Sequence, residues 1–210
     1  MVGGPEMIRV SNKGLSDLEK FFQRAPEAAT TAARMAINDT VSRQGMQMIR
    51  KDMMAQVAFP AGYLSGDRLF IAKRATNNNL EAVVLGRKRA TSLARFAAGT
   101  TVLSGKGGVQ VRIKSGRTTY LKRAFLVRLR AGASMSEDKY NVGLALRLSP
   151  GERLNKNTPH RAWLVPGKVA LLYGPSVDQV FSDVADKVAD PIGDMVTTEF
   201  FRQFARLTGG

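Results

Sequence analysis

The sequence contains no cysteine and a single histidine, His160. The missing thiols exclude disulfides, thiolate metal sites and cysteine nucleophiles. The segment from Lys156 to Arg161 supplies no acid that could orient His160 as a general base, so a structural or exposed histidine is the better interpretation. The acids are also not clustered at the spacing of metal ligands. We therefore expect no catalytic residue, no metal site and no cofactor, and we expect that the protein is not an enzyme.

Long apolar runs are absent as well. No stretch approaches the roughly 18 apolar residues that a membrane-spanning helix needs. The first residues, Met1 to Glu6, lack the basic and apolar regions of a signal peptide. We therefore expect no membrane partner. Apolar residues still make up 44 % of the 210 residues, which is enough for one well-filled core. We expect a single domain over residues 1–210.

Phosphate-loop spacing is also missing. The segment Gly105-Lys106-Gly107-Gly108 lacks the separation between glycine and Gly-Lys-Ser/Thr that a nucleotide loop requires, and a strand pattern follows it instead of a helix. We interpret this segment as a turn. Aromatic residues are few between residues 68 and 130, so stacking of bases on aromatic rings is not the expected mode of any nucleic-acid contact.

Helical patterns occupy both ends of the chain. The first, over residues 15–57, begins with the capping box Ser16–Glu19 and continues after Pro26 with an Ala- and Met-rich stripe at steps of three and four residues. The second, over residues 176–207, begins with the capping box Ser176–Gln179. Asp190 and Pro191 predict that this second helix stops and restarts there.

The middle of the chain, residues 64–173, alternates in polarity. Val109, Val111 and Ile113 are separated by polar residues, and similar alternation follows in residues 125–130 and 142–148. A period of two predicts half-buried strands, so we expect one apolar sheet face and one basic face. The predicted fold class is α+β, with a long N-terminal helix packed on a mainly antiparallel sheet and with C-terminal helices.

Acidic residues are scarce in the same region. Residues 68 to 130 contain fifteen basic side chains and one acid, Glu81, and fifteen minus one is +14 of the total net charge of +15. Residues 176 to 207 contain six acids against three bases. Charge runs are usually solvated faces, but an excess of this size favours an acidic partner. The chain is bipolar, which suits head-to-tail contact between copies.

Two sets of candidate residues follow from these patterns. The basic face for a partner or for DNA comprises Arg87, Lys88, Arg89, Arg95, Arg112, Lys114, Arg128 and Arg130. The assembly or core stripe of the C-terminal helix comprises Ser176, Phe181, Phe200 and Phe204, and we expect its phenylalanines to be buried in the subunit or against a neighbour.

The order of several short segments resembles the minor tail protein Z family of tailed bacteriophages over roughly residues 30–185. The most specific segment is Leu172-Tyr173-Gly174-Pro175-Ser176-Val177-Asp178-Gln179-Val180-Phe181. The other segments are Ala36-Ile37-Asn38-Asp39-Thr40, Ala94-Arg95-Phe96, Gly108-Val109-Gln110-Val111-Arg112-Ile113-Lys114 and Arg123-Ala124-Phe125-Leu126-Val127.

This resemblance implies a structural role without catalytic residues. Proteins of the family complete the tail at its head-proximal end and help to join it to the head. Their relatives are small α+β subunits that commonly form hexameric rings around the tail axis. The implied partners are other copies of the chain, tail terminator, tail tube or head–tail connector proteins, and DNA that passes through the lumen. The implied location is the virion tail or neck, after assembly in the host cytoplasm.

Two alternatives remain open at this stage. A non-specific DNA-binding protein could use the basic sheet face, with phosphate contacts that weaken steeply with salt. A tail terminator or another head–tail connector subunit would have a similar small α+β fold, and only its position in the particle would distinguish it.

Overall fold

The computed structural model describes residues 23, 25–98, 108–129, 141–149, 164–165 and 169–209. It shows an α+β protein whose strand pairs are all antiparallel within this part of the chain. The contacts divide the chain into two compact units, where the sequence led us to expect one domain. Unit 1 comprises residues up to Met53, Leu64–Arg87 and Asp178–Gly210; unit 2 comprises Met54–Tyr63 and Lys88–Val177.

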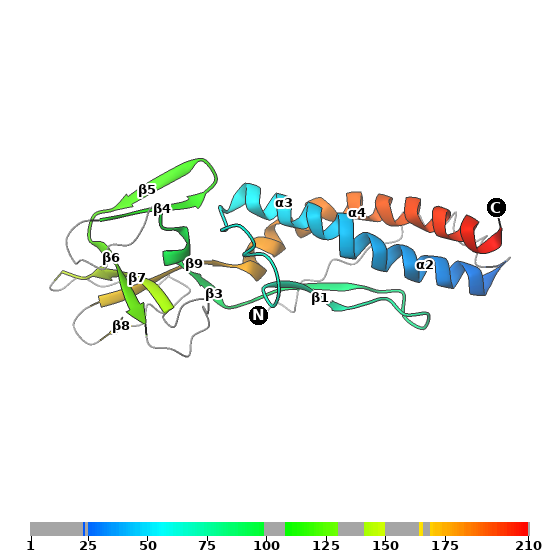
Figure 1. Cartoon of the computed structure of the whole chain (residues 1–210), viewed down its shortest axis with the longest axis horizontal. Helices are drawn as coiled ribbons and strands as arrows, with labels where there is room; N and C mark the ends of the chain where they lie inside the picture. Colours follow the sequence, from blue (N-terminus) through cyan, green and yellow to red (C-terminus); the bar gives the residue numbers. More distant parts are fainter. Residues whose placement is uncertain are drawn as a thin grey trace. The chain divides into compact units, whose positions relative to one another are not determined.

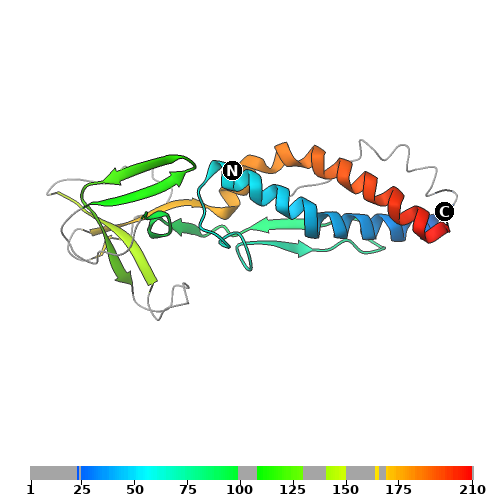
Figure 2. The same cartoon turned by 45° about the horizontal axis from the view of Figure 1, so that its top comes forward.

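Unit 1 is built from a long helical run that lies alongside a second, antiparallel helix (Figures 1 and 2). The run consists of α2 (Pro26–Thr40), one π-helical stretch η1 (Val41–Gly45) and α3 (Met46–Gln56), which continues across the unit boundary after Met53. Its proline at the first helical position suits a helix start, because proline lacks the N–H that would be unpaired there. The expected capping box Ser16–Glu19 lies outside the described residues.

The opposing helix, α4 (Val177–Thr208), is one continuous helix and not two. The prediction of a restart at Asp190 and Pro191 was wrong, because Pro191 lies inside the helix and is exposed. The apolar stripe continues across the proline: Val188 and Ile192 are 1 % and 2 % exposed. A proline in a helix costs a backbone hydrogen bond, and burial of the uninterrupted stripe offsets that cost.

Small residues let the two helices approach. Ala29, Ala32, Ala33 and Ala36 form a buried cluster with Phe200 of α4. Because alanine side chains are short, they leave room for this large ring. Farther along, a Cβ atom on Gly45 would lie 3.1 Å from the Thr40 carbonyl oxygen and 3.7 Å from Cδ1 of Ile192. The π-helical stretch of one helix and the proline of the other therefore occur at the same level of the pair.

A two-stranded hairpin completes unit 1. It consists of β1 (Leu69–Lys73) and β2 (Val83–Gly86). Asn38 of α2 fixes the segment after β1 by two hydrogen bonds: its side-chain nitrogen donates to the Ala75 carbonyl, and its side-chain oxygen accepts from the Ala75 amide, both at 2.9 Å. The hairpin is thus tied to the helix pair by backbone-specific contacts.

Unit 2 contains the larger sheet. Its strand order is β3 (Ala90–Ser92), β9 (Val169–Ser176), β7 (Asn141–Arg147) and β6 (Ala124–Leu129), and β8 (Leu164–Val165) also pairs with β9. A short 3-10 helix, η2 (Leu93–Phe96), follows β3. A separate hairpin is formed by β4 (Val109–Lys114) and β5 (Arg117–Leu121).

The core of unit 2 combines sheet residues with an aromatic group. Leu144, Ala145 and Ala170 are fully buried in the sheet. Phe59 stacks on Tyr63 with ring centroids 5.5 Å apart and packs against Phe96 of η2 at 5.8 Å. Because neighbouring residues Leu144 and Ala145 are both buried, β7 is covered on both faces, unlike the half-exposed strand that its alternation predicted.

Candidate functional site

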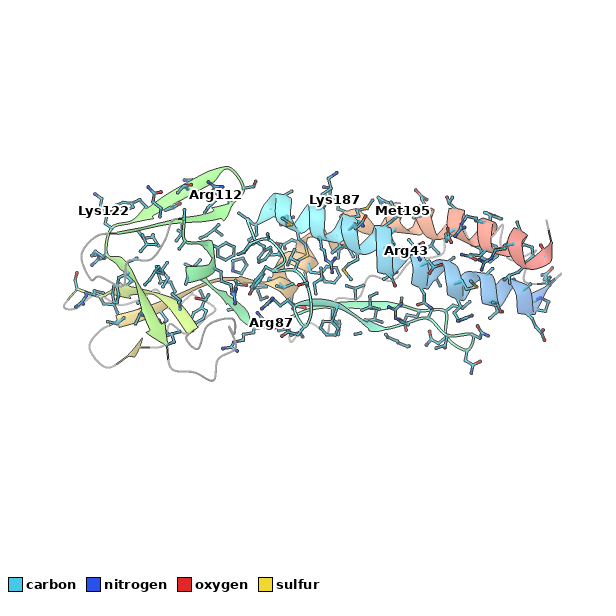
Figure 3. All side chains as sticks on the ribbon, in the orientation of Figure 1. Arg43, Arg87, Arg112, Lys122, Lys187 and Met195 are labelled. Atoms are coloured by element: carbon cyan, nitrogen blue, oxygen red, sulfur yellow. The ribbon has the colours of Figure 1, made fainter. Side chains whose placement is uncertain are left out.

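The β4–β5 hairpin carries exposed cations on both of its sides, because the register places Arg117 on the side of Val111 and Thr119 and Arg112 on the other, and together these cations form the basic face of the hairpin. Its exposed cations are Arg112, Lys114, Arg117 and, directly after β5, Lys122. Val111, in alternate position, is 1 % exposed, so β4 shows the expected division between a buried and a solvent face. Residues 108–123 contain no acid that could neutralise this basic face locally. Figure 3 labels Arg112 and Lys122 on the hairpin.

Tyr120 is an exposed aromatic residue of the same hairpin, on the opposite side of β5 from Arg117. Its side chain is 54 % exposed, and it is the register partner of Gln110 on β4. Its hydroxyl accepts a hydrogen bond of 3.0 Å from the Gly108 amide. A Cβ atom on Gly108 would lie 2.6 Å from both the Leu121 carbonyl oxygen and Tyr120 Cζ, so only glycine fits there. The ring is therefore fixed in place although it faces solvent.

The structure does not assemble the predicted basic face on one sheet. Arg112 and Lys114 lie on the separate β4–β5 hairpin, whereas Arg128 lies on β6 of the larger sheet. The register pairs position 128 with Val142 and Phe125 with Ala145, so position 128 of β6 and Arg147, a cation on β7, fall on opposite faces of that sheet. The expectation of one continuous basic sheet face was wrong, because it assumed a pairing that alternation alone does not determine. Arg130 lies outside the described residues.

The other predicted cations have different surroundings. Arg87 of unit 1 forms an ion pair of 3.4 Å with Asp67, and its side chain is only 21 % exposed. In unit 2, the Arg95 guanidinium lies 4.9 Å from the centroid of the Tyr63 ring, a cation–π contact. Lys88 and Arg89 are exposed between β2 and β3. Arg87 and Arg95 thus have structural partners and are less suited to an external ligand than the hairpin cations.

The predicted assembly residues lie inside the protein. Ser176, at the end of β9 in unit 2, is 2 % exposed. In unit 1, Phe181 and Phe200 of α4 are each 1 % exposed, and Phe204 is partly buried and stacks on Phe200 with centroids 5.8 Å apart. These phenylalanines are therefore core residues of the chain itself.

The opposite side of α4 is an acidic face. Asp183, Asp186, Asp190 and Asp194 are all exposed, and their steps of three and four residues place them on one stripe. Among the described residues, none of these four carboxylates lies within ion-pair distance of a cation. Lys187 lies near this stripe, but its ammonium group forms an ion pair of 2.8 Å with Asp52.

A second polar cluster joins α4 to α2. Arg202 donates two hydrogen bonds to Glu199, of 2.8 and 2.5 Å. The buried Gln203 amide donates to Glu199 at 2.6 Å and to Asp39 at 3.4 Å. The hydrogen bond from Arg202 is the main cause that lowers the pKa of Glu199, against a smaller opposing effect of burial. This cluster stabilises the helix pair and leaves Glu199 ionised.

Sequence reasoning missed parts of both surfaces. It did not include Arg117 and Lys122, because β5 was not predicted as a strand. The signal was present in Ser115 and Gly116, a two-residue turn in which Gly116 has φ 76°. The acids of α4 were counted, but their common stripe was obscured by the predicted break at Pro191.

Within the ranges that the structure describes, no group of three or more His, Asp or Glu side chains is arranged to hold a metal ion. Within the same ranges, no helix combines the length and the apolar character needed to cross a membrane. His160 lies outside these ranges. No protein-family model, curated protein or solved structure matches this chain.

Proposed function

We propose that this protein is a structural virion subunit that forms a ring at the head-proximal end of a phage tail and joins the tail to the head. The observation that carries the proposal is the location of the most specific resembling segment, residues 172–181. It spans the point where β9 ends and α4 begins, and its residues Ser176, Val177 and Phe181 are 2 %, 0 % and 1 % exposed. A motif made of buried residues fits a structural family better than a catalytic one.

The finer fold prediction belongs to the same proposal. The resemblance implies one small α+β subunit. The corresponding elements here are α2 to α3, the strands β3 to β9, and α4. In this reading, these elements form one tail-completion subunit whose partners are other copies, a tail terminator, tail tube protein or head–tail connector, and DNA in the lumen.

The virion location can be tested on particles. Phages produced from a genome that carries the gene with a short epitope tag are purified and labelled with gold-conjugated antibody. We expect one cluster of label at the junction between head and tail. Purified particles without the protein, shown by labelling and by mass spectrometry of their peptides, would overturn the proposed function.

The ring can be tested on the purified protein. Its absolute mass is measured by light scattering at low and at moderate salt, with electron microscopy of the same samples. We expect closed rings of about six subunits, because a heterologous contact between identical copies closes when its rotation divides the circle. A monomer at every concentration and salt would contradict a self-assembling ring.

A second candidate function is non-specific DNA binding through the hairpin. Its supporting observation is the exposure of Arg112, Lys114, Arg117 and Lys122 without an acid among residues 108–123. If these cations contact phosphates, log K should fall by about 0.9 per contacted phosphate for each unit of log salt. Little affinity for duplex DNA at low salt would assign the basic face to a protein partner.

A further inference from the structure

Two surfaces of this chain carry opposite charge that their own neighbours do not balance. The basic face of the β4–β5 hairpin presents Arg112, Lys114, Arg117 and Lys122. The acidic face of α4 presents Asp183, Asp186, Asp190 and Asp194. Within the described part of the chain, neither set forms an ion pair.

Each surface is unfavourable when it faces only water. On α4, Asp186, Asp190 and Asp194 follow one another at four-residue steps, and like charges at this spacing destabilise a helix. On the hairpin, Lys114 and Arg117 are register partners, so two cations lie directly opposite each other across the strands. A partner of opposite charge would relieve the repulsion on both surfaces.

The two surfaces also match in length. From Asp183 to Asp194 the helix advances eleven residues, or about 17 Å at 1.5 Å per residue. From Val109 to Lys114 the strand advances five residues, or about 17 Å at 3.3 Å per residue. Lys122 follows the register partner of Val109, and Arg117 pairs with Lys114, so the cations span this whole length.

We propose that the basic face of the hairpin in one copy docks on the acidic face of α4 in a second copy. The contact is heterologous, because it joins two different surfaces of the chain. Each copy then has one basic and one acidic face to offer, so the contact repeats from copy to copy. This inference deepens the proposed ring subunit and rests on it for the biological setting, but the contact itself is a property of the chain.

A second copy fits these observations better than nucleic acid does. DNA on the hairpin would neutralise its cations and leave the four carboxylates of α4 without a counter-charge. Docking between copies neutralises both faces with the same contact. Tyr120, on the side of the hairpin that carries Arg112, is 54 % exposed, and the exposed Phe201, 41 %, follows Asp194 by seven residues on the same side of α4. The contact would therefore have apolar area beside its ion pairs.

Charge reversal on each face provides the test. The hairpin variant carries Arg112→Glu, Lys114→Glu and Lys122→Glu, and the helix variant carries Asp183→Lys, Asp186→Lys and Asp194→Lys. Absolute mass is measured by light scattering at low salt for each variant and for an equimolar mixture. We expect wild-type protein to associate, each variant alone to be monomeric, and the mixture to regain association, because every contact in it again joins opposite charges.

A matched control separates the surface from the change in net charge. Lys51→Glu, Lys88→Glu and Arg89→Glu alter the net charge as much as the hairpin variant does, at exposed positions outside both faces. This control should associate like wild type, and circular dichroism should show all variants folded. If the mixture of the two reversed variants stays monomeric, or if either variant alone associates like wild type, the proposed contact is wrong.

Failure of this contact and failure of the proposed function give different results. A hairpin variant that loses affinity for duplex DNA but keeps its mass would overturn the contact and assign the basic face to DNA. A wild-type protein that is monomeric at low salt would also overturn it. Label at the head–tail junction of particles would support the virion role in either case.

Discussion

Gly45 is a residue of unit 1 at which a side chain would meet both helices. A Cβ atom there would lie 3.1 Å from a backbone oxygen, which cannot move as a flexible side chain can. We expect Gly45→Val to destabilise the protein by about 1–3 kcal/mol, because its methyl groups would overpack the space beside Ile192. The measurement is the free energy of unfolding from chemical denaturation.

The neighbouring residue Gln44 supplies the control, since it lies in the same π-helical stretch but is exposed. Gln44→Val should change stability by no more than about 0.5 kcal/mol. Equal effects of the two substitutions would mean that the β-branched side chain disturbs the π-helical stretch itself and that Ile192 is not the cause.

The lowered pKa of Glu199 predicts that the stability of the protein depends on pH. Because Arg202 lowers the pKa of this carboxyl in the folded protein, the carboxylate contributes stability above the ordinary pKa of glutamate. That contribution is lost as pH falls through the lowered value. Between about pH 5 and about pH 3, the Tm of wild type should therefore fall more than that of Glu199→Gln.

Asp183→Asn provides the comparison for Glu199, because Asp183 is an exposed acid of the same helix without an ion pair among the described residues. A parallel fall of wild type and Glu199→Gln would show that the hydrogen bonds from Arg202 and Gln203 do not persist in solution.

At the scale of elements, Pro191 makes α4 less stable than an uninterrupted helix. Pro191→Ala would restore a backbone hydrogen bond and remove the clash with the preceding turn. Part of that gain is offset because alanine leaves the unfolded chain more freedom. We expect a net stabilisation of about 1–2 kcal/mol, measured by chemical denaturation.

The exposed position Thr198 of the same helix serves as a control for Pro191, and Thr198→Ala should change stability by about 0.5 kcal/mol at most. A loss of stability in Pro191→Ala would have a specific meaning. It would show that the proline positions Ile192 against Gly45 and that the two irregularities are matched.

Whether a segment is a helix or a strand could be predicted from the sequence, because the spacing of apolar residues that indicates it lies within the segment itself. The alternation of residues 109–113 predicted β4, and the stripe from Ala29 to Met53 predicted the helical run. Pairing could not be read in the same way, because the partner of a strand depends on contacts between distant residues. The alternation of apolar and polar residues on β6 and β7 did not reveal that Arg128 would pair with Val142. This pairing decides on which face of the sheet position 128 lies.

At the scale of the whole molecule, the segregation of charge was visible in the sequence, but its concentration on two defined faces was not. The fifteen basic side chains of residues 68–130 include Arg87, which forms an ion pair with Asp67, and Arg95, which makes a cation–π contact with Tyr63. Only the structure separates these from the hairpin cations that remain available. The same holds for α4, where Glu199 accepts a hydrogen bond from Arg202, while the four aspartates of the acidic face are exposed to solvent.

The gathering of opposite charges on two faces predicts that a second copy of the chain and a polyanion compete for the cations of the hairpin. If the basic face of the hairpin binds the acidic face of a second copy, short duplex DNA at low salt should occupy the same cations and lower the average mass of the protein. The helix variant with Asp183, Asp186 and Asp194 changed to lysine should bind DNA at least as tightly as wild type, because its hairpin is intact and its net charge is more positive. The measurement is light scattering during a DNA titration, paired with fluorescence anisotropy of the labelled duplex. Assemblies that bind DNA and keep their full mass would show that DNA and the second copy use different surfaces, and the hairpin could then serve only one of them.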